Sequence, residues 1–235
     1  MADITDPELV AHEYASLDRL SNRRLDRTGW LRGVEEISAL LGAIAEARPR
    51  RILDAGCGNG EWAALLTAPE IVCVDQSAAA VEAARARGLE ALRANIESLP
   101  FEDGSFDVVM CNWVLYHLDN LDQGLKEIAR VLRPGGRFVG AYNLQGHLDE
   151  VWSRVESGWP SDAFDGHNGA DALARHFVAV ERRDTTGAVL WENRAALQAY
   201  LDAFREMLGE LHAPQGRYPL RATRRNCVFV AHKAL

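Results

Sequence analysis

Apolar and polar positions along the chain follow two different rhythms. From residue 34 to residue 44, apolar side chains recur at helical spacing, which is typical of an amphipathic helix that buries one face. They are Val34, Ile37, Leu40, Leu41 and Ile44. We therefore expect the first fifty residues to be helical.

Beyond residue 50, short β-prone runs alternate with helical stretches. The β-prone runs are Arg51–Ala55, Ile71–Asp75, Leu89–Ala94, Phe106–Asn112 and Arg137–Tyr142. The helical stretches are Glu61–Thr67, Ala78–Arg87 and Leu121–Leu132. This alternation predicts βαβ units, and therefore an α/β fold with a doubly wound, mostly parallel sheet and helices on both faces.

The last third of the chain continues the mixed pattern. It predicts a helix around Leu148–Glu156, a loop over 158–168, a strand at Phe177–Asp184, a helix near Ala195–Leu208 and a strand at Asn226–His232. We expect the late strands to complete the same sheet. No repeat, low-complexity tract or Gly/Ser linker marks a boundary, so the whole chain, 1–235, is expected to form one domain.

The charge balance bears on possible partners. The formal net charge of -8 disfavours a protein that binds nucleic acid through its phosphates, because such binding relies on clustered Lys and Arg. Two arginine clusters keep a basic face open, although solvated or ion-paired surface is the simpler interpretation. They are Arg19, Arg23, Arg24 and Arg27, and Arg217, Arg221, Arg224 and Arg225.

Cysteine and histidine spacing predicts neither a disulfide framework nor a metal site. The four cysteines are far apart with no C-x-x-C pair, so we expect reduced core thiols. They are Cys57, Cys73, Cys111 and Cys227.

No run of about 18 apolar residues occurs and the N-terminus is acidic and polar, so we expect a cytoplasmic protein without a membrane segment.

The most informative segment is a strand that runs into a glycine-rich turn. Its sequence is Ile52-Leu53-Asp54-Ala55-Gly56-Cys57-Gly58-Asn59-Gly60. Because glycine has no Cβ, such a turn lets the backbone pass close to a ligand at the carboxyl end of the strand, where open α/β sheets bind theirs. The alternative is a tight turn that binds nothing.

A second acidic residue ends the next strand. Asp75 lies 21 residues after Asp54 and is followed by Gln76. In nucleoside-binding doubly wound folds, an acidic side chain at this place accepts hydrogen bonds from both ribose hydroxyls. Capping of the following helix is the alternative role, and the two are compatible.

Five segments together resemble the class I S-adenosylmethionine-dependent methyltransferase family, in its type 11 or UbiE-like small-molecule branch. They are residues 52–60, 74–75, 94–101, 105–109 and 132–136, in the family's order and spacing. The resemblance implies a Rossmann-like sheet of seven strands, the last antiparallel, with S-adenosyl-L-methionine across the carboxyl ends of the first strands. It also implies an N-terminal helical lid (1–48), a cofactor-binding core (49–142) and an acceptor-side segment (143–235).

The resemblance also implies which residues contact the methionine and ribose parts of the cofactor. Asp54 and the backbone of Gly56, Cys57 and Gly58 would hold the amino-acid part. Asp75 and Gln76 would hold the ribose.

The adenine and the lid follow from the same resemblance. Asn95 and Ile96 occupy the positions that flank the adenine; the family often has Asp where this chain has Asn95, whose amide oxygen can still accept a hydrogen bond. Arg32 resembles an arginine that pairs with the cofactor carboxylate, and Tyr14 resembles a lid tyrosine. A surface arginine and a packed aromatic are the alternatives.

The segment Cys111–Leu118 follows the fourth strand and is expected to form a wall of the acceptor pocket, with Asn112 beside the cofactor. Tyr116 and His117 are the candidate catalytic residues, and His117 has an unperturbed pKa that suits a general base. A loop-ordering hydrogen bond is the alternative role for His117. Weaker candidates for acceptor contacts are Tyr142, Asn143, His147 and the loop 164–169.

These observations predict metal-independent, in-line methyl transfer from S-adenosylmethionine to an oxygen, nitrogen or carbon atom of a small molecule. An NAD(P)-dependent oxidoreductase shares the fold but requires G-x-G-x-x-G, whereas the turn here is G-x-G-x-G. An RNA methyltransferase lacks support from an Asn-Pro-Pro-Tyr type motif but stays open because of the arginine clusters. A non-catalytic S-adenosylmethionine-binding protein also stays open.

Overall fold

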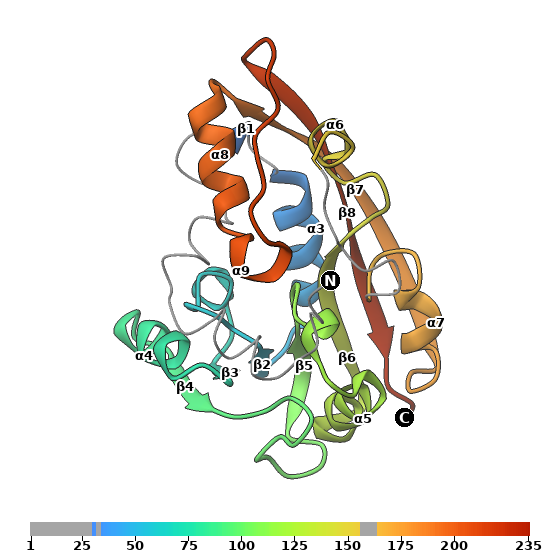
Figure 1. Ribbon diagram of the computed structural model, residues 1–235. Coiled ribbons are helices and arrows are strands. Elements are labelled where there is room, and N and C mark those ends of the chain that lie inside the picture. Colours follow the sequence, from blue (N-terminus) through green and yellow to red (C-terminus); the bar gives the residue numbers. More distant parts are fainter. Residues whose placement is uncertain (1–29, 32–33, 156–163) are drawn as a thin grey trace.

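The computed structural model describes residues 30–31, 34–155 and 164–235. One eight-stranded sheet runs through it, in the spatial order β1-β7-β8-β6-β5-β2-β3-β4 (Figure 1). The strands are β1 (Trp30–Leu31), β2 (Arg51–Ala55), β3 (Glu70–Asp75), β4 (Glu90–Arg93), β5 (Phe106–Met110), β6 (Leu132–Asn143), β7 (Ala179–Trp191) and β8 (Leu220–His232).

Short helices connect these strands. The α-helices are α3 (Val34–Ala45), α4 (Ala78–Ala86), α5 (Leu121–Val131), α6 (Asp149–Trp152), α7 (Gly169–Leu173), α8 (Arg194–Asp202) and α9 (Arg205–Leu208). Two 3₁₀ turns, η1 (Ala63–Leu65) and η2 (Leu115–His117), follow β2 and β5.

The pairing of the strands confirms the expected fold class. Strands β4, β3, β2, β5 and β6 are parallel, and β8 runs antiparallel between β6 and β7. This is the predicted seven-stranded sheet with its last strand antiparallel. The short strand β1 is an addition, since Trp30 pairs with Val189 of β7. The prediction of helix throughout the first fifty residues is therefore wrong at β1, which covers an otherwise open sheet edge.

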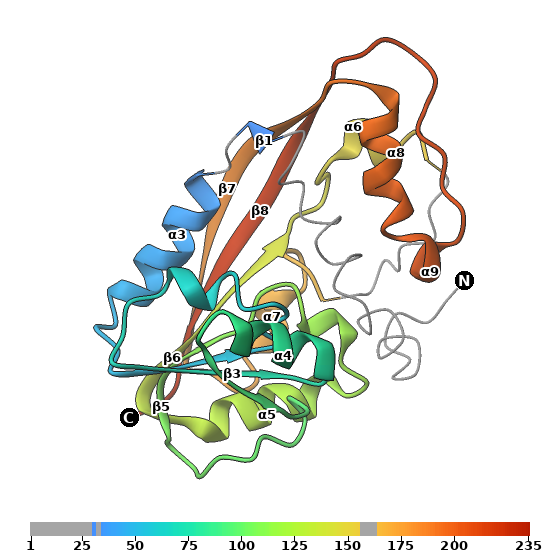
Figure 2. The same ribbon diagram turned by 90° about the vertical axis from the view of Figure 1, so that its left-hand side faces the viewer.

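Alternate residues of the central strands serve opposite faces of the sheet. Ile52 packs with α3, whereas its neighbour Leu53 packs in the main core with α5 and α7. Helix α4 lies on the α3 side, against Cys73 of β3. Because both faces are covered (Figures 1 and 2), strands such as β5 are buried at every position.

The helical segments differ from the sequence prediction in four places. The helix expected at 61–67 shrinks to η1, which ends where Leu66 takes an extended backbone with a ψ of 151°. The helix expected near 148–156 is reduced, within the described residues, to the four-residue α6. The helix expected at 195–208 is divided into α8 and α9. No hydrophobic pattern predicts α7, which follows the expected loop.

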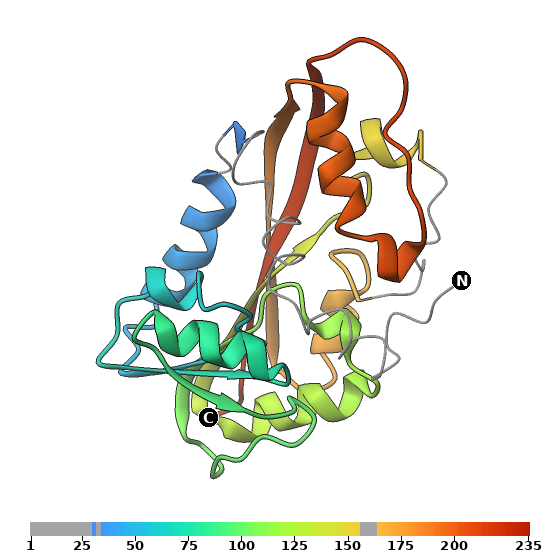
Figure 3. The ribbon, with the colours of Figure 1, turned by 60° about the vertical axis from the view of Figure 1, so that its left-hand side comes forward.

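The last two strands are longer than predicted. β6 stops pairing with β8 at Asn143↔Asn226, but β7 and β8 continue together as far as Trp191↔Leu220. This extension, residues 186–191 and 220–225, carries α6, α8 and α9. We call the extension and these helices the cap, and Figures 2 and 3 show it projecting beyond the end of β6. The cap has a hydrophobic core of its own, which includes Trp191, Leu197 and Leu201.

All four cysteines are buried and none forms a disulfide, as expected. Within the described ranges, no helix is long and apolar enough to cross a membrane.

Candidate functional site

The glycine turn after β2 adopts a backbone that other residues rarely take. Gly56, Gly58 and Gly60 have φ angles of 78°, 54° and 77°. At Gly56 a Cβ would also lie 2.5 Å from a methyl carbon of Val114. Glycine is therefore required at Gly56 both by conformation and by the close approach of the loop after β5.

The N–H groups of this turn are directed to β3. Gly56 and Cys57 both donate to the Val74 carbonyl, at 2.8 and 3.0 Å, and Gly58 donates to Asp75 Oδ2 at 2.9 Å. The turn is followed by η1 and not by an α-helix. A pyrophosphate site needs unengaged N–H groups at a helix N-terminus, so this turn is poorly suited to a dinucleotide.

The side chain that leads into the turn is acidic and would suit a cationic group better than a phosphate. Asp54, at the end of β2, is only 2% exposed. Cys57 turns its side chain into a cluster with Cys73, and the contact with Cys73 together with burial raises the pKa of its thiol. The Cys57 side chain is thus turned away from the predicted cofactor site, and a role for its backbone stays a prediction.

Asp75 connects the turn to the start of α4. Its Oδ2 accepts the Gly58 N–H and its Oδ1 accepts the Ser77 N–H, both at 2.9 Å. Burial raises the pKa of the carboxyl, against the lowering effect of these backbone hydrogen bonds. The N-cap of α4 is Ser77, whose hydroxyl accepts the Ala80 N–H at 3.2 Å, so Asp75 is not the capping residue. Gln76, next along the chain, is exposed.

The two predicted adenine neighbours point in different directions. Asn95 is exposed, and its Oδ1 accepts the Glu97 N–H at 2.8 Å. A carbonyl oxygen has a second lone pair, so Asn95 keeps acceptor capacity. The side chain of Ile96 is buried in the main core, which leaves its backbone for a ligand contact.

Asn112 joins the ends of β5 and β6. It is 8% exposed, and its Oδ1 accepts the Ala141 N–H at 2.9 Å. Its Nδ2 is buried and has no partner among the described residues. The next residue, Trp113, has a φ of 51° and donates its Nε1–H to Asn143 Oδ1 at 3.0 Å. These contacts fix the backbone where the two strands end.

Tyr116 and His117 lie together on η2. Their ring centroids are 4.4 Å apart at an angle of 62°. His117 is 8% exposed, and Tyr116 is half-buried. The structure brings the two candidate catalytic residues together but does not test their chemistry, so both roles stay predictions.

Comparisons with known proteins identify the domain. Residues 53–140, which contain the turn, Asp75, Asn112 and His117, match a family model described as a methyltransferase domain. Over this part the chain is therefore a class I S-adenosylmethionine-dependent methyltransferase. It is 29% identical over 184 residues to the malonyl-[acyl-carrier protein] O-methyltransferase of Pseudescherichia vulneris, covering 75% of this chain and 68% of that one.

Other relatives are matched over a shorter length. The chain is 37% identical over 140 residues to the demethylmenaquinone methyltransferase of Deinococcus radiodurans, or 55% of each chain. It thus spans about half the length of this relative. The solved structure of the YcgJ protein from Bacillus subtilis has 19% identity and a TM-score of 0.62, and the match covers 86% of this chain and 99% of that one. This last likeness shows the fold alone.

The residues at the carboxyl edge suit the methyl donor of this family. S-adenosylmethionine carries an ammonium group, a sulfonium and a ribose diol, all of which favour carboxylate or carbonyl acceptors. Asp54 and Asp75 are such acceptors. Backbone N–H groups of Gly58, Ser77 and Gln76 bond to the Asp75 carboxylate, which has about four acceptor sites and so keeps capacity for a further donor. The predicted partner of the cofactor carboxylate, Arg32, and the lid residue Tyr14 lie outside the described residues.

Two of the weaker acceptor candidates are wrong in this methyltransferase. Tyr142 is fully buried, donates its hydroxyl to the Cys111 carbonyl at 2.6 Å and packs edge-on against Phe164. Both rings belong to the main core, where they support the loop after β5. Asn143 and His147, by contrast, hold the backbone at the edge of the sheet, through Trp113 and Arg225 respectively.

The second arginine cluster does not form one basic face. Arg224 pairs with Glu36 of α3 at 2.7 Å, with side-chain exposures of 8% and 4%, and burial raises the pKa of Glu36 despite this partner. Arg225, on the opposite face of β8, lines a separate pocket. Nothing in the sequence pattern could have paired Glu36 with Arg224, because the two residues are 188 positions apart.

Proposed function

We propose that this protein transfers a methyl group from S-adenosylmethionine to an oxygen, nitrogen or carbon nucleophile of a small molecule, without a metal ion. The observation that carries the proposal is the environment of Asp75. This half-buried carboxylate ends the second strand of the parallel sheet and is bonded to the backbone of both the glycine turn and the start of α4. Nucleoside-binding doubly wound folds use an acidic residue at this place to bind the ribose, which supports the proposal.

When bound, S-adenosylmethionine supplies a methyl carbon made electrophilic by its sulfonium. The chain's own residues bind and orient it. In this proposal Asp54 accepts from the ammonium group, and Asp75 accepts from the ribose hydroxyls. Asn112, by joining β5 to β6, sets the spacing of the segments that would hold donor and acceptor, and such positioning is the main source of rate in an in-line displacement.

A hydroxyl or protonated amine acceptor must also lose a proton. His117, buried beside Tyr116 on η2, is the base that we propose for this step. Replacement of His117 by Asn should lower kcat by about 10²-fold or more, whereas a change within a few-fold would rule out a base at this position.

A small-molecule acceptor is supported by the charge distribution and by the relatives. Arg224 is buried in an ion pair with Glu36, so its charge is not available to bind nucleic-acid phosphates. Two relatives bear the names of a malonyl-[acyl-carrier protein] O-methyltransferase and a demethylmenaquinone methyltransferase. Incubation with labelled S-adenosylmethionine and total RNA should therefore yield no labelled RNA.

The cofactor is tested by calorimetric titration of the full chain with S-adenosylmethionine, S-adenosylhomocysteine and NAD. We expect the first two to bind and NAD to give no heat. Asp75→Asn should weaken S-adenosylmethionine binding by about 1.5–3 kcal/mol, the range for hydrogen bonds to a charged group. Asp171→Asn, which changes an exposed carboxylate on α7, is the matched control and should have no effect. An unchanged affinity in Asp75→Asn would contradict the ribose assignment.

A further inference from the structure

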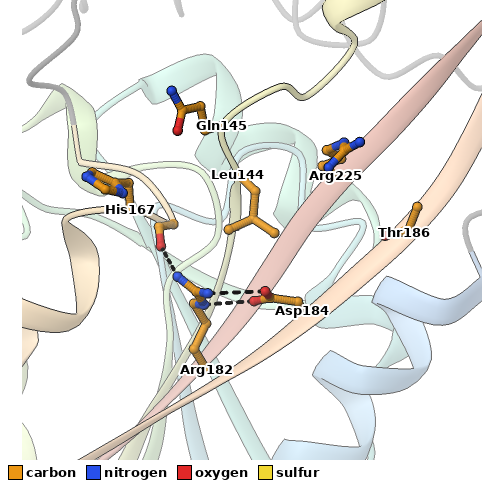
Figure 4. Close-up of a pocket in the computed structure, with 8 residues that line it drawn as sticks. Leu144, Gln145, His167, Arg182, Asp184, Thr186 and Arg225 are labelled. Carbon is orange, nitrogen blue, oxygen red and sulfur yellow. Dashed lines mark hydrogen bonds and ion pairs between the residues drawn. The ribbon is translucent and has the colours of Figure 1, made fainter.

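A pocket lies at the base of the cap, on the face of the sheet that α7 covers. Its volume is about 290 Å³, room for a small organic molecule rather than for a single ion. The residues that line it are Leu144, Gln145, Gly166, His167, Arg182, Asp184, Thr186 and Arg225 (Figure 4).

The two arginines of this pocket differ in their partners. Arg182 donates to the Gly166 carbonyl at 2.8 Å and forms a two-point ion pair with Asp184, at 2.8 and 3.2 Å. Its charge is therefore balanced, and it holds the loop that forms one wall. Arg225 has no ion pair within the part of the chain that the structure describes, and Figure 4 shows no interaction reaching it from the other lining residues.

The backbone of Arg225 is fixed even though its guanidinium is not. Its carbonyl accepts the Leu144 N–H at 2.9 Å and lies 2.9 Å from His147 Nδ1. A nearby carboxylate, Glu150, accepts from Thr223 with both oxygens, at 3.0 and 2.6 Å. Arg225 lies near enough to Glu150 to help lower the pKa of that carboxyl, but forms no ion pair with it. The pocket thus holds one arginine on a rigid strand whose guanidinium has no ion pair among the described residues, together with the hydroxyl of Thr186 and the amide of Gln145.

The register places the pocket next to the carboxyl edge where the methyl donor is proposed to bind. The last pair between β6 and β8 is Asn143↔Asn226, so Arg225 is the first residue of β8 beyond the end of β6. Leu144, which lines the pocket, packs against the same main core as Val114 and Tyr116 of the loop after β5. A molecule anchored at Arg225 would extend along this edge toward the loop after β5.

We propose that this pocket binds the anionic end of the methyl acceptor, a carboxylate or a phosphate, with Arg225 as the charged contact. The inference rests on the proposed function, since it assigns part of the acceptor site. A planar guanidinium suits either anion, because it donates two parallel hydrogen bonds.

The test is calorimetric titration of the full chain with glutarate for the carboxylate arm, phenyl phosphate for the phosphate arm and neutral glutaramide as the uncharged control. We expect one of the two anions to bind and glutaramide not to bind. Arg225→Gln should weaken anion binding about ten- to hundredfold. Arg221→Gln, an exposed arginine four residues away on the same strand that does not line the pocket, should stay within twofold of the unchanged protein.

A second variant, Thr186→Leu, fills the pocket without changing its charge and should also abolish anion binding. The proposal is overturned if neither anion binds, if glutaramide binds equally well, or if Arg221→Gln weakens binding as much as Arg225→Gln. Affinity for S-adenosylmethionine, measured in the same variants, should be unchanged. Failure of the original chain to bind S-adenosylmethionine, with Arg225-dependent anion binding intact, would overturn the proposed function and not the anion pocket.

Discussion

The two ends of this molecule are built by different kinds of contact. In the cofactor half, β2 to β5, the polar groups of the site are satisfied within short stretches of chain; Asp75 and Gly58 are only 17 positions apart. At the base of the cap, Thr223 meets Glu150 across 73 positions, and Glu36 meets Arg224 across 188. The proposed donor site is thus built by local turns, whereas the proposed acceptor pocket is built by long-range strand pairing.

The largest expected effect comes from emptying the core of the cap. Trp191 is fully buried there and lies against Tyr200, with ring centroids 5.5 Å apart. Trp191→Ala should lower the free energy of unfolding by about 3–5 kcal/mol. If the two halves are as separate as their contacts indicate, affinity for S-adenosylmethionine should stay within twofold.

Chemical denaturation and calorimetry on the same samples measure both quantities. A loss of S-adenosylmethionine affinity beyond tenfold in the folded Trp191→Ala protein would show that the cap and the cofactor half are coupled.

A smaller effect is expected in the glycine turn. Gly56→Ala must adopt a left-handed backbone and also meets Val114, so we expect a loss of about 2–4 kcal/mol. Gly88→Ala is a matched control, because Gly88 has a φ of 83° but open space around it, and should lose only the conformational part, about 1–2 kcal/mol.

Adding Val114→Ala to Gly56→Ala should recover the difference between these two variants in thermal unfolding. No recovery would mean that backbone conformation alone accounts for the requirement for glycine at Gly56.

The smallest effect is a dependence on pH at the base of the cap. Burial lowers the pKa of His147 to about 4, from an ordinary value of 6.5. The unfolded chain therefore binds more protons between these values, and stability that is complete above about pH 6.5 is lost as the pH falls toward 4. Because His147 is only half-buried, we expect a loss of about 1–2 kcal/mol at pH 5.

Unfolding measured at pH 7.5 and pH 5 should show this loss reduced in His147→Gln and retained in His212→Gln, since His212 is exposed. Asp75 contributes in the opposite direction, because its raised pKa makes the folded state bind more protons as the pH falls. An equal response in the two histidine variants would remove His147 as the cause.

The sequence predicts the cofactor half well because its signals are local. A strand that ends in Asp54 and a glycine turn, followed by a strand that ends in Asp75, determines the edge of the sheet without reference to distant residues. The length of β7 and β8 could not be predicted, because their outer halves are polar, with stretches such as Arg221–Arg225, and become strands only by pairing with each other. Arg225 and Thr186 lie in these outer halves, so the pocket could not be predicted from the sequence either.

The sequence pattern also underestimates the burial of aromatic side chains that carry a polar group, such as Tyr142. Tyr142 follows a predicted strand and has a polar tip, which favours a binding role in the absence of a structure. In the folded chain its hydroxyl meets the Cys111 carbonyl and its ring meets Phe164, so it belongs to the interior. Only the packing of the loop over residues 164–169 onto the sheet decides between the two interpretations.

The alternation of β8 has a consequence for how this protein can change in length. Arg224 faces the buried Glu36, and Arg225 faces the pocket on the opposite side of the strand. Losing or gaining one residue within β8 would therefore turn Arg224 toward the pocket and Arg225 toward the interior. The connection over residues 209–219 lies outside both sites. Its Leu211 and Ala213 pack in the core of the cap, but its residues 215–217 are exposed and have no such constraint. Insertions and deletions during evolution should therefore accumulate in that connection and spare the strand that follows it.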